Sequence, residues 1–141
     1  MQGIILAAGM GSRLKKLTQN KPKCMVEVSG ITLIERALKQ LDKLHLNRIV
    51  IVTGYASDIL TNFVYGFDIV TPIVYVNNDI YDQTNNIYSL YLAKDFLESD
   101  DTLLLESDLI FEEGILEKIL NDKEENLALV DKYESWMDGT C

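Results

Sequence analysis

The chain has 141 residues, of which 48% are hydrophobic, so it is long enough to form one domain with a real core. Its formal net charge of −9 argues against nucleic acids and anionic membrane surfaces as partners. No apolar run approaches the roughly 20 residues of a membrane-spanning helix, and the amino terminus lacks a signal-peptide pattern. The two cysteines, Cys24 and Cys141, have no metal-ligand spacing, and a reduced cytoplasmic setting is the default expectation.

The first third of the chain predicts a strand, a short extended segment and a helix. The run Gly3–Ala8 is short, continuously apolar and followed by glycine, which is typical of a buried strand. Residues 25–28 predict an extended segment that ends at Ser29–Gly30. Thr32, with Glu35 three positions later, forms a capping box and therefore begins a helix. The expected apolar face of this helix comprises Ile34, Ala37, Leu38, Leu41 and Leu44.

The middle of the chain repeats this alternation. The β-branched run Arg48–Thr53 predicts a second buried strand, and residues 58–64 predict a short helix. A third strand is expected over Ile69–Val76, where Pro72 favours a sheet edge or a bulge. His45 ends the preceding helical pattern, which is more typical of a surface or capping residue than of a catalyst.

Two helices and two strands are predicted in the remainder. One helix is capped within Asn85–Asn86 and runs to about Leu97. Its expected buried residues are Ile87, Leu90, Tyr91 and Leu97. The other helix has Glu112–Glu113 in its first turn. Its expected apolar face comprises Ile115, Leu116, Ile119 and Leu120. Strands are predicted over Thr102–Leu105 and from Leu127 to Val130.

Strands that alternate with helices predict an α/β fold, a Rossmann-like three-layer sandwich with a mostly parallel sheet. Ligands of such sheets bind beyond the carboxyl ends of the strands. The loop at Gly9 and the carboxylate of Asp108 each follow a predicted strand, so both are expected at that edge.

The loop after the first strand has the composition of a phosphate site. Gly9 and Gly11 tolerate positive φ and let backbone N–H groups approach an anion closely. The small neighbours that leave this approach open are Ala7, Ala8 and Ser12. Arg13 offers a planar fork of donors, and Lys23, stiffened by Pro22, offers a mobile point charge. Both cations suit phosphate oxygens, so the string predicts a polyphosphate site.

Two better-known phosphate loops are excluded. The Walker loop needs lysine and then serine or threonine after its last glycine, where this chain has Ser12–Arg13–Leu14. The dinucleotide fingerprint needs a third glycine, where this chain has Leu14. A tight turn with an incidental surface arginine is the alternative for a bare glycine pair. The complete string, with Arg13 and Pro22–Lys23, favours the phosphate site.

Asp108 is the second candidate functional residue. It lies three residues after Leu105, on a loop just past a buried strand, where a carboxylate can ligate Mg²⁺. Capping of the following helix is the alternative role for an aspartate there. Glu106 is a weaker metal candidate and is equally typical of a solvated carboxylate.

The segment Leu6–Arg13 with Pro22–Lys23 resembles the signature of the nucleotidyltransferases that activate sugar phosphates and phospho-amino-alcohols. Within that superfamily it is most similar to the bacterial CTP:phosphocholine and 2-aminoethylphosphonate cytidylyltransferases. Further similar stretches are Ile49–Tyr55, Thr84–Leu90 and Leu103–Asp108, so the resemblance extends over most of the chain. It implies an α/β fold of the nucleotide-diphospho-sugar transferase type.

The resemblance also implies a reaction. CMP would pass from CTP to a small phosphorylated acceptor, phosphocholine or 2-aminoethylphosphonate, with Mg²⁺ as cofactor and pyrophosphate as product. In this reaction Arg13 would hold the leaving phosphates, Lys23 would neutralise the α-phosphate and Asp108 would hold the metal. The implied nucleotide-binding residues are Leu6, Ala7, Ala8, Gly9, Gly11, Ser12, Arg13, Lys23, Thr84 and Asn85.

These residues would divide the nucleotide between them. Residues 6–9 would offer backbone groups to the pyrimidine, while Thr84 and Asn85 would contact base or ribose. Capping of a helix is an equally good role for Asn85, and the two roles are compatible.

The chain departs from the family pattern at its carboxyl end. Family members run longer, and their later part supplies a second acidic metal ligand and much of the acceptor pocket. We therefore expect residues 1–141 to form a single nucleotidyltransferase domain, an amino-terminal portion without the carboxyl-terminal part, in which Trp136 packs rather than binds acceptor. The alternatives are a sugar-1-phosphate uridylyl- or thymidylyltransferase and a truncated, inactive nucleotide-binding fragment. A homodimer and a fusion to a further domain are both compatible with the sequence.

Overall fold

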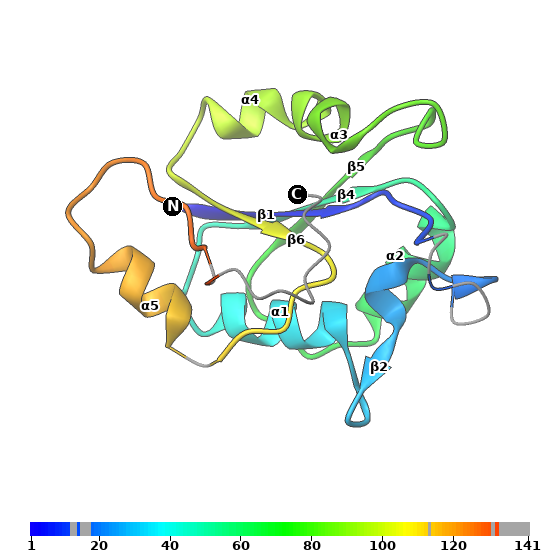
Figure 1. Ribbon diagram of the computed structural model, residues 1–141, viewed down its shortest axis with the longest axis horizontal. Helices are drawn as coiled ribbons and strands as arrows, with labels where there is room; N and C mark the ends of the chain where they lie inside the picture. The colour runs from blue at the N-terminus through cyan, green and yellow to red at the C-terminus, as the bar shows by residue number, and fades with distance from the viewer. Residues whose placement is uncertain (12–13, 15–17, 113, 131, 133–141) are drawn as a thin grey trace. The chain divides into compact units, whose positions relative to one another are not determined.

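The computed structural model describes residues 1–11, 14, 18–112, 114–130 and 132. The chain divides into two units, Met1–Ile110 and Phe111–Cys141. The first unit holds a four-stranded parallel sheet in the order β5-β4-β1-β6 (Figure 1). The bounds of its strands are β1 (Gln2–Ala7), β4 (Ile49–Thr53), β5 (Ile73–Asn77) and β6 (Thr102–Glu106). A separate antiparallel hairpin pairs β2 (Glu27–Val28) with β3 (Ile31–Thr32).

Helices cover both faces of this sheet. One face carries α3 (Asn86–Leu92) and α4 (Lys94–Leu97), and the other carries α1 (Leu33–Asp42) and α2 (Ser57–Tyr65) (Figure 1). The two central strands are buried throughout because both of their faces are covered. The core beneath α3 and α4 contains Ile4, Leu6, Val50, Val52 and Ala93. The predicted α/β sandwich with a mostly parallel sheet is confirmed.

Local sequence signals located several element ends correctly. The Thr32 hydroxyl accepts a hydrogen bond from the Glu35 amide at 3.3 Å and begins α1. Asn85 caps α3 by accepting from the amides of the next turn. β5 is an edge strand, as Pro72 indicated, although the proline lies just before the strand and not within it. His45 is exposed with a φ of 52° in the turn after α1, in agreement with a surface role.

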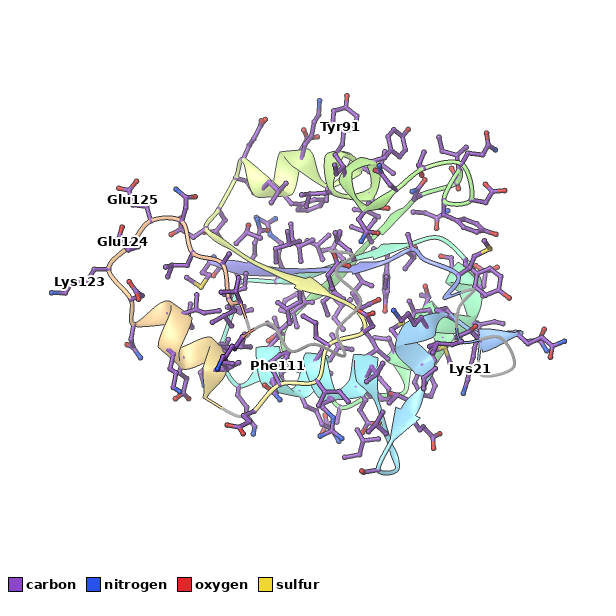
Figure 2. All side chains as sticks on the ribbon, in the orientation of Figure 1. Lys21, Tyr91, Phe111, Lys123, Glu124 and Glu125 are labelled. Carbon is purple, nitrogen blue, oxygen red and sulfur yellow. The ribbon has the colours of Figure 1, made fainter. Side chains whose placement is uncertain are left out.

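The predicted helix over 85–97 is wrong in two respects. The helix breaks at Ala93, so α3 and α4 are separate. Ile87 and Tyr91, expected in the core, are 76% and 57% exposed, and Figure 2 shows Tyr91 pointing away from the sheet. The helix starts at Asn86 in an orientation that packs Leu90 and Ala93 on the sheet, which leaves Ile87 and Tyr91 on the outer side.

Three boundaries also differ in the first unit. Met25 belongs to the 3-10 helix η2 (Lys23–Met25) and not to an extended segment. Leu44 lies beyond the end of α1, in the turn that leads to β4. The third strand begins at Ile73 rather than at Ile69, because the residues before it form a turn tied to Asp42.

In the second unit, α5 (Ile115–Leu120) is present as predicted. Gly114, with a φ of 85°, precedes it, so Glu112 lies outside the helix and Glu117 is the acidic residue of its first turn. The strand predicted from Leu127 is wrong: residues 127–130 are exposed and form no strand. A strand needs a neighbour to pair with, which an apolar pattern alone does not supply. Within the described residues, no helix is long and apolar enough to cross a membrane.

Candidate nucleotide site

The carboxyl ends of β1 and β6 carry the candidate site. These strands are direct neighbours, with Leu6 in register with Glu106, so the glycine loop and Asp108 emerge side by side. The Lys23 ammonium forms an ion pair with the Asp108 carboxylate, although 85 residues separate them. The two side chains are 35% and 34% exposed. The prediction that the loop and Asp108 share one sheet edge is confirmed.

Gly11 fits this site for a steric reason. Its φ is +64°, and a Cβ there would lie 2.8 Å from the Cβ of Lys23 and 3.1 Å from the Thr18 methyl group. The Thr18 hydroxyl also donates to the Gly11 carbonyl at 2.9 Å. Gly11 is therefore packed against the stem of Lys23, the residue whose ammonium pairs with Asp108. A Cβ on Gly9 would meet no described atom within 4 Å, so packing does not require a glycine there.

Tyr55 holds the base of the glycine loop, a role that the sequence analysis did not assign. Its amide donates to the Ala8 carbonyl at 3.1 Å, and its hydroxyl donates to the Gln19 carbonyl at 2.9 Å. A Cβ on Gly54 would lie 2.9 Å from that same Ala8 oxygen and 2.8 Å from the Cβ of Tyr81. The signal for Tyr55 was its place just past β4, at the same edge of the sheet.

Glu106 is the second carboxylate near the ion pair. The residue is exposed overall, yet partial desolvation of its carboxylate raises the pKa of Glu106, and the neighbouring Asp108 charge raises it further. A hydrogen bond from Asn86 and the charge of Lys23 act in the opposite direction. The Asn86 amide nitrogen lies 3.1 Å from each of the two carboxylate oxygens. Sequence reasoning considered Asn86 only as a helix cap and missed this contact.

The predicted base and ribose contacts lie in a loop with its own internal bonds. Asn78, 1% exposed, donates to the Thr84 hydroxyl at 3.0 Å and to the Ser89 hydroxyl at 3.1 Å. The Thr84 hydroxyl donates its proton to the Ile80 carbonyl at 2.9 Å, so toward a ligand its oxygen acts as an acceptor. The Asn85 side-chain oxygen caps α3. The roles of Thr84 and Asn85 toward the nucleoside stay predictions.

Of the other predicted nucleotide-binding residues, Leu6 and Ala7 lie within β1, whereas Ala8 and Gly9 follow it. Leu6 pairs with residues of both neighbouring strands, and Ala7 pairs with a residue of one. Their backbone groups are therefore used in strand pairing and are less available to a ligand. Ala8 and Gly9 lie past the strand end and are the better candidates for backbone contacts to a base. The predicted sites Ser12 and Arg13, like Trp136, lie outside the described residues.

Asp108 has the donor chemistry that Mg²⁺ prefers. This ion binds proteins through one or two carboxylates and completes its shell with water and substrate phosphates. In the part of the chain that the structure describes, no group of three or more His, Cys, Asp or Glu side chains could hold a metal ion. A cation at this site would have to be held jointly with phosphate, and the role of Asp108 as its protein ligand stays a prediction.

A parallel α/β sheet with a glycine loop, a lysine and a carboxylate at its carboxyl edge is the arrangement expected of an α/β nucleotidyltransferase. The chain belongs to the family of MobA-like NTP transferase domains, whose sequence model matches residues 3–136. This membership confirms the resemblance found in the sequence and the type of fold that it implied.

Individual relatives agree with the family. The chain is 38% identical over 141 residues to CTP:phosphoglutamine cytidylyltransferase of Campylobacter jejuni, which covers 96% of this chain and 54% of that protein. It is 37% identical over 107 residues to 2-aminoethylphosphonate cytidylyltransferase of Lancefieldella rimae, with coverage of 76% and 42%. The solved CTP:phosphocholine cytidylyltransferase of Streptococcus pneumoniae matches with a TM-score of 0.67 at 35% identity, covering 79% of this chain and 47% of that one. The chain thus spans about half the length of these relatives.

Proposed function

We propose that this chain transfers CMP from CTP to a phosphorylated amino-alcohol, an aminoalkylphosphonate or a phosphorylated amide, with release of pyrophosphate. The observation that carries the proposal is the Lys23–Asp108 pair beside Gly11, at the ligand-binding edge of the sheet. Similarity to CTP:phosphoglutamine, 2-aminoethylphosphonate and choline-phosphate cytidylyltransferases supports the choice of base and acceptor class. The proposed location is the cytoplasm.

The described residues suit this reaction. An acceptor phosphate or phosphonate oxygen attacks the α-phosphorus in line, and the bond from that phosphorus to the bridging oxygen of pyrophosphate breaks. Lys23 would neutralise charge on the α-phosphate. Asp108 would hold Mg²⁺, which would supply Lewis-acid polarisation of phosphate oxygens. Arg13 and the loop amides are proposed to hold the β- and γ-phosphates. A side-chain base is not required, because the acceptor is already an anion near neutral pH.

The test is a matrix of nucleotides and acceptors. The 141-residue chain is incubated with Mg²⁺, one of CTP, UTP or dTTP, and one of phosphocholine, 2-aminoethylphosphonate, phosphoglutamine or glucose 1-phosphate. Pyrophosphate is measured with a coupled assay, and CTP binding is measured separately by calorimetry. Turnover with CTP and a nitrogen-containing acceptor supports the proposal, and turnover confined to glucose 1-phosphate contradicts it.

A sugar-1-phosphate uridylyl- or thymidylyltransferase is the second candidate. It is favoured by 32% identity over 125 residues to the UTP–glucose-1-phosphate uridylyltransferase AglF of Haloferax volcanii. A putative glucose-1-phosphate thymidylyltransferase of Bacillus anthracis matches with a TM-score of 0.71 at 27% identity. This candidate predicts turnover of UTP or dTTP with glucose 1-phosphate in the same matrix.

An inactive nucleotide-binding chain is the third candidate, because the chain spans about half the length of its relatives. It predicts that calorimetry detects CTP binding while no combination of nucleotide and acceptor releases pyrophosphate. CTP binding by the wild-type chain and by Asp108→Asn is then compared with and without Mg²⁺. If Asp108 holds the ion, Mg²⁺ strengthens CTP binding only in the wild-type chain.

A further inference from the structure

The positive charge of Lys23 acts on two carboxylates at the end of β6, those of Asp108 and Glu106. Lys23 forms its ion pair with Asp108, while its charge also acts on Glu106, which lies two residues earlier in the chain. The Asp108 charge acts on Glu106 as well. These three charged groups therefore share one small region, and their sum is one negative charge. A nucleoside triphosphate is an anion, so the arrangement of these charges affects its binding affinity.

Glu106 has a neutral hydrogen-bond partner, Asn86. The Asn86 amide nitrogen lies at hydrogen-bond distance, 3.1 Å, from both carboxylate oxygens of Glu106. Asn86 is the first residue of α3, whose start is fixed by the Asn85 cap. A hydrogen bond to a charged acceptor is stronger than one between neutral groups, so the amide gives the carboxylate a preferred orientation.

The alternative position of Glu106 would obstruct the site. Among the described residues, Lys23 is the cation whose charge acts on the Glu106 carboxylate. Its pair with Asp108 is about one-third exposed, so without the amide Glu106 could compete for the ammonium. A second carboxylate on Lys23 would add negative charge where a phosphate has to bind. Repulsion between like charges would then weaken nucleotide binding.

We propose that Asn86 is a positioning residue: it holds the Glu106 carboxylate at the start of α3 and thereby reserves Lys23 for Asp108 and for nucleotide phosphate. This inference rests on the proposed function of the site for its consequence on nucleotide binding. Its structural claim concerns two side chains and stands independently of the substrate.

The structural claim is tested by a crystal structure of Asn86→Ala without nucleotide. Alanine is a good first residue of a helix and leaves the Asn85 cap in place, and a thermal melt verifies the fold. The expected result is a Glu106 carboxylate within ion-pair distance of Lys23. A Glu106 side chain that keeps its original orientation overturns the proposal.

The functional claim is tested by a rescue experiment. Asn86→Ala is expected to weaken Mg²⁺–CTP binding about tenfold by calorimetry, because a competing carboxylate now neutralises Lys23. Adding Glu106→Gln to Asn86→Ala should restore binding to that of Glu106→Gln alone, since the competing charge is gone. Equal losses in Asn86→Ala and in the double variant overturn the proposal, because they indicate a structural defect.

A matched control exists at the opposite end of the sheet. The Asn47 amide donates to the Asp100 carboxylate at 2.7 Å, so Asn47→Ala breaks the same kind of bond far from the site and should leave CTP binding unchanged. Failure of the wild-type chain to bind CTP contradicts the proposed function alone, since the crystal structure of Asn86→Ala still decides where Glu106 goes. Unchanged CTP binding by Asn86→Ala, with wild-type binding intact, contradicts the positioning role alone.

Discussion

The polar side chains at the two ends of the parallel sheet differ in burial and in the kind of partner they have. At the amino end, fully buried Gln2 donates to the Thr102 hydroxyl at 3.0 Å and to the Phe96 carbonyl, and accepts from Arg48 at 2.9 Å. At the carboxyl end, Lys23 and Asp108 pair with each other in a partly exposed position. The first group is fully engaged inside the protein, while the second pair can exchange its partners for a ligand.

This difference separates stability from function within one sheet. Hydrogen bonds of a fully buried side chain cannot be released without leaving an unsatisfied donor or acceptor, so they fix the fold. A partly exposed ion pair contributes little to stability and is screened by solvent. Substitutions at the amino end should therefore lower stability, and substitutions at the carboxyl end should lower activity.

The largest effect is expected from Lys23→Met, which keeps the stem that packs on Gly11 and removes the charge. Loss of a preorganised charge at the transferred phosphate should lower kcat/KM for CTP by about 100- to 1,000-fold, while unfolding free energy changes by less than about 0.5 kcal/mol. Lys39→Met is the control, because Lys39 also pairs with a carboxylate, Glu35, on the surface of α1. Wild-type turnover by Lys23→Met would remove the lysine from the proposed reaction.

The second effect concerns the amino end. Gln2→Ala removes three hydrogen bonds of a fully buried side chain and leaves the Thr102 hydroxyl and Arg48 short of a partner. We expect a loss of about 2–3 kcal/mol in unfolding free energy, measured by urea denaturation, with kcat/KM per folded molecule unchanged. The exposed Asn47→Ala at the same end should lose less. A large fall in kcat/KM with intact stability would contradict the division between the two ends.

A smaller, pH-dependent effect is expected from Asp42→Asn. The Thr71 hydroxyl and amide, each 2.7 Å from the carboxylate, and then the Val70 amide lower the pKa of Asp42 in the folded protein. A lowered folded-state pKa adds stability above the unfolded pKa of about 4, and this stability is lost as the pH falls through the lower folded value.

The variant should therefore be less stable than wild type at pH 7, by about 1 kcal/mol. The difference should shrink as the pH falls below about 4. Urea denaturation at pH 7, 5, 4 and 3.5 measures the difference. A difference that grows toward acid pH would show that the carboxylate of Asp42 is not the stabilising form.

The smallest effect on function is expected from the thiol that follows Lys23. Cys24 is 1% exposed, and burial raises the pKa of its thiol to about 12, so little thiolate forms at neutral pH. In a Cys141→Ser background, iodoacetamide should modify the folded chain far more slowly than the urea-unfolded chain. Turnover should be insensitive to the reagent on the same timescale. Rapid modification of folded protein would show that η2 opens at the site.

Local signals in the sequence were sufficient for much of this picture. The Thr32–Glu35 capping box, the strand at residues 3–8 and the positive φ of Gly11 all depend on residues within one turn or one strand. The shared edge of the loop and Asp108 followed from the rule that parallel strands place their carboxyl ends together. Such statements do not depend on which strands are neighbours.

Contacts across the fold were not accessible in that way. The break at Ala93 and the exposure of Ile87 and Tyr91 depend on how α3 sits on the sheet. The contact of Asn86 with Glu106 joins a helix start to a strand end 20 residues away. A helical period shows that one face is apolar, and it cannot show where the neighbouring sheet ends.

The sequence by itself determined the class of fold, the place of the glycine loop and the candidate cation and carboxylate. These follow from backbone preferences and apolar periodicity, which act over a few residues. Only the tertiary structure decided that β6 lies next to β1, that Lys23 pairs with Asp108 and that Asn86 donates a hydrogen bond to Glu106. Those outcomes depend on strand order and helix placement, which are set by packing of the whole core and by no single segment.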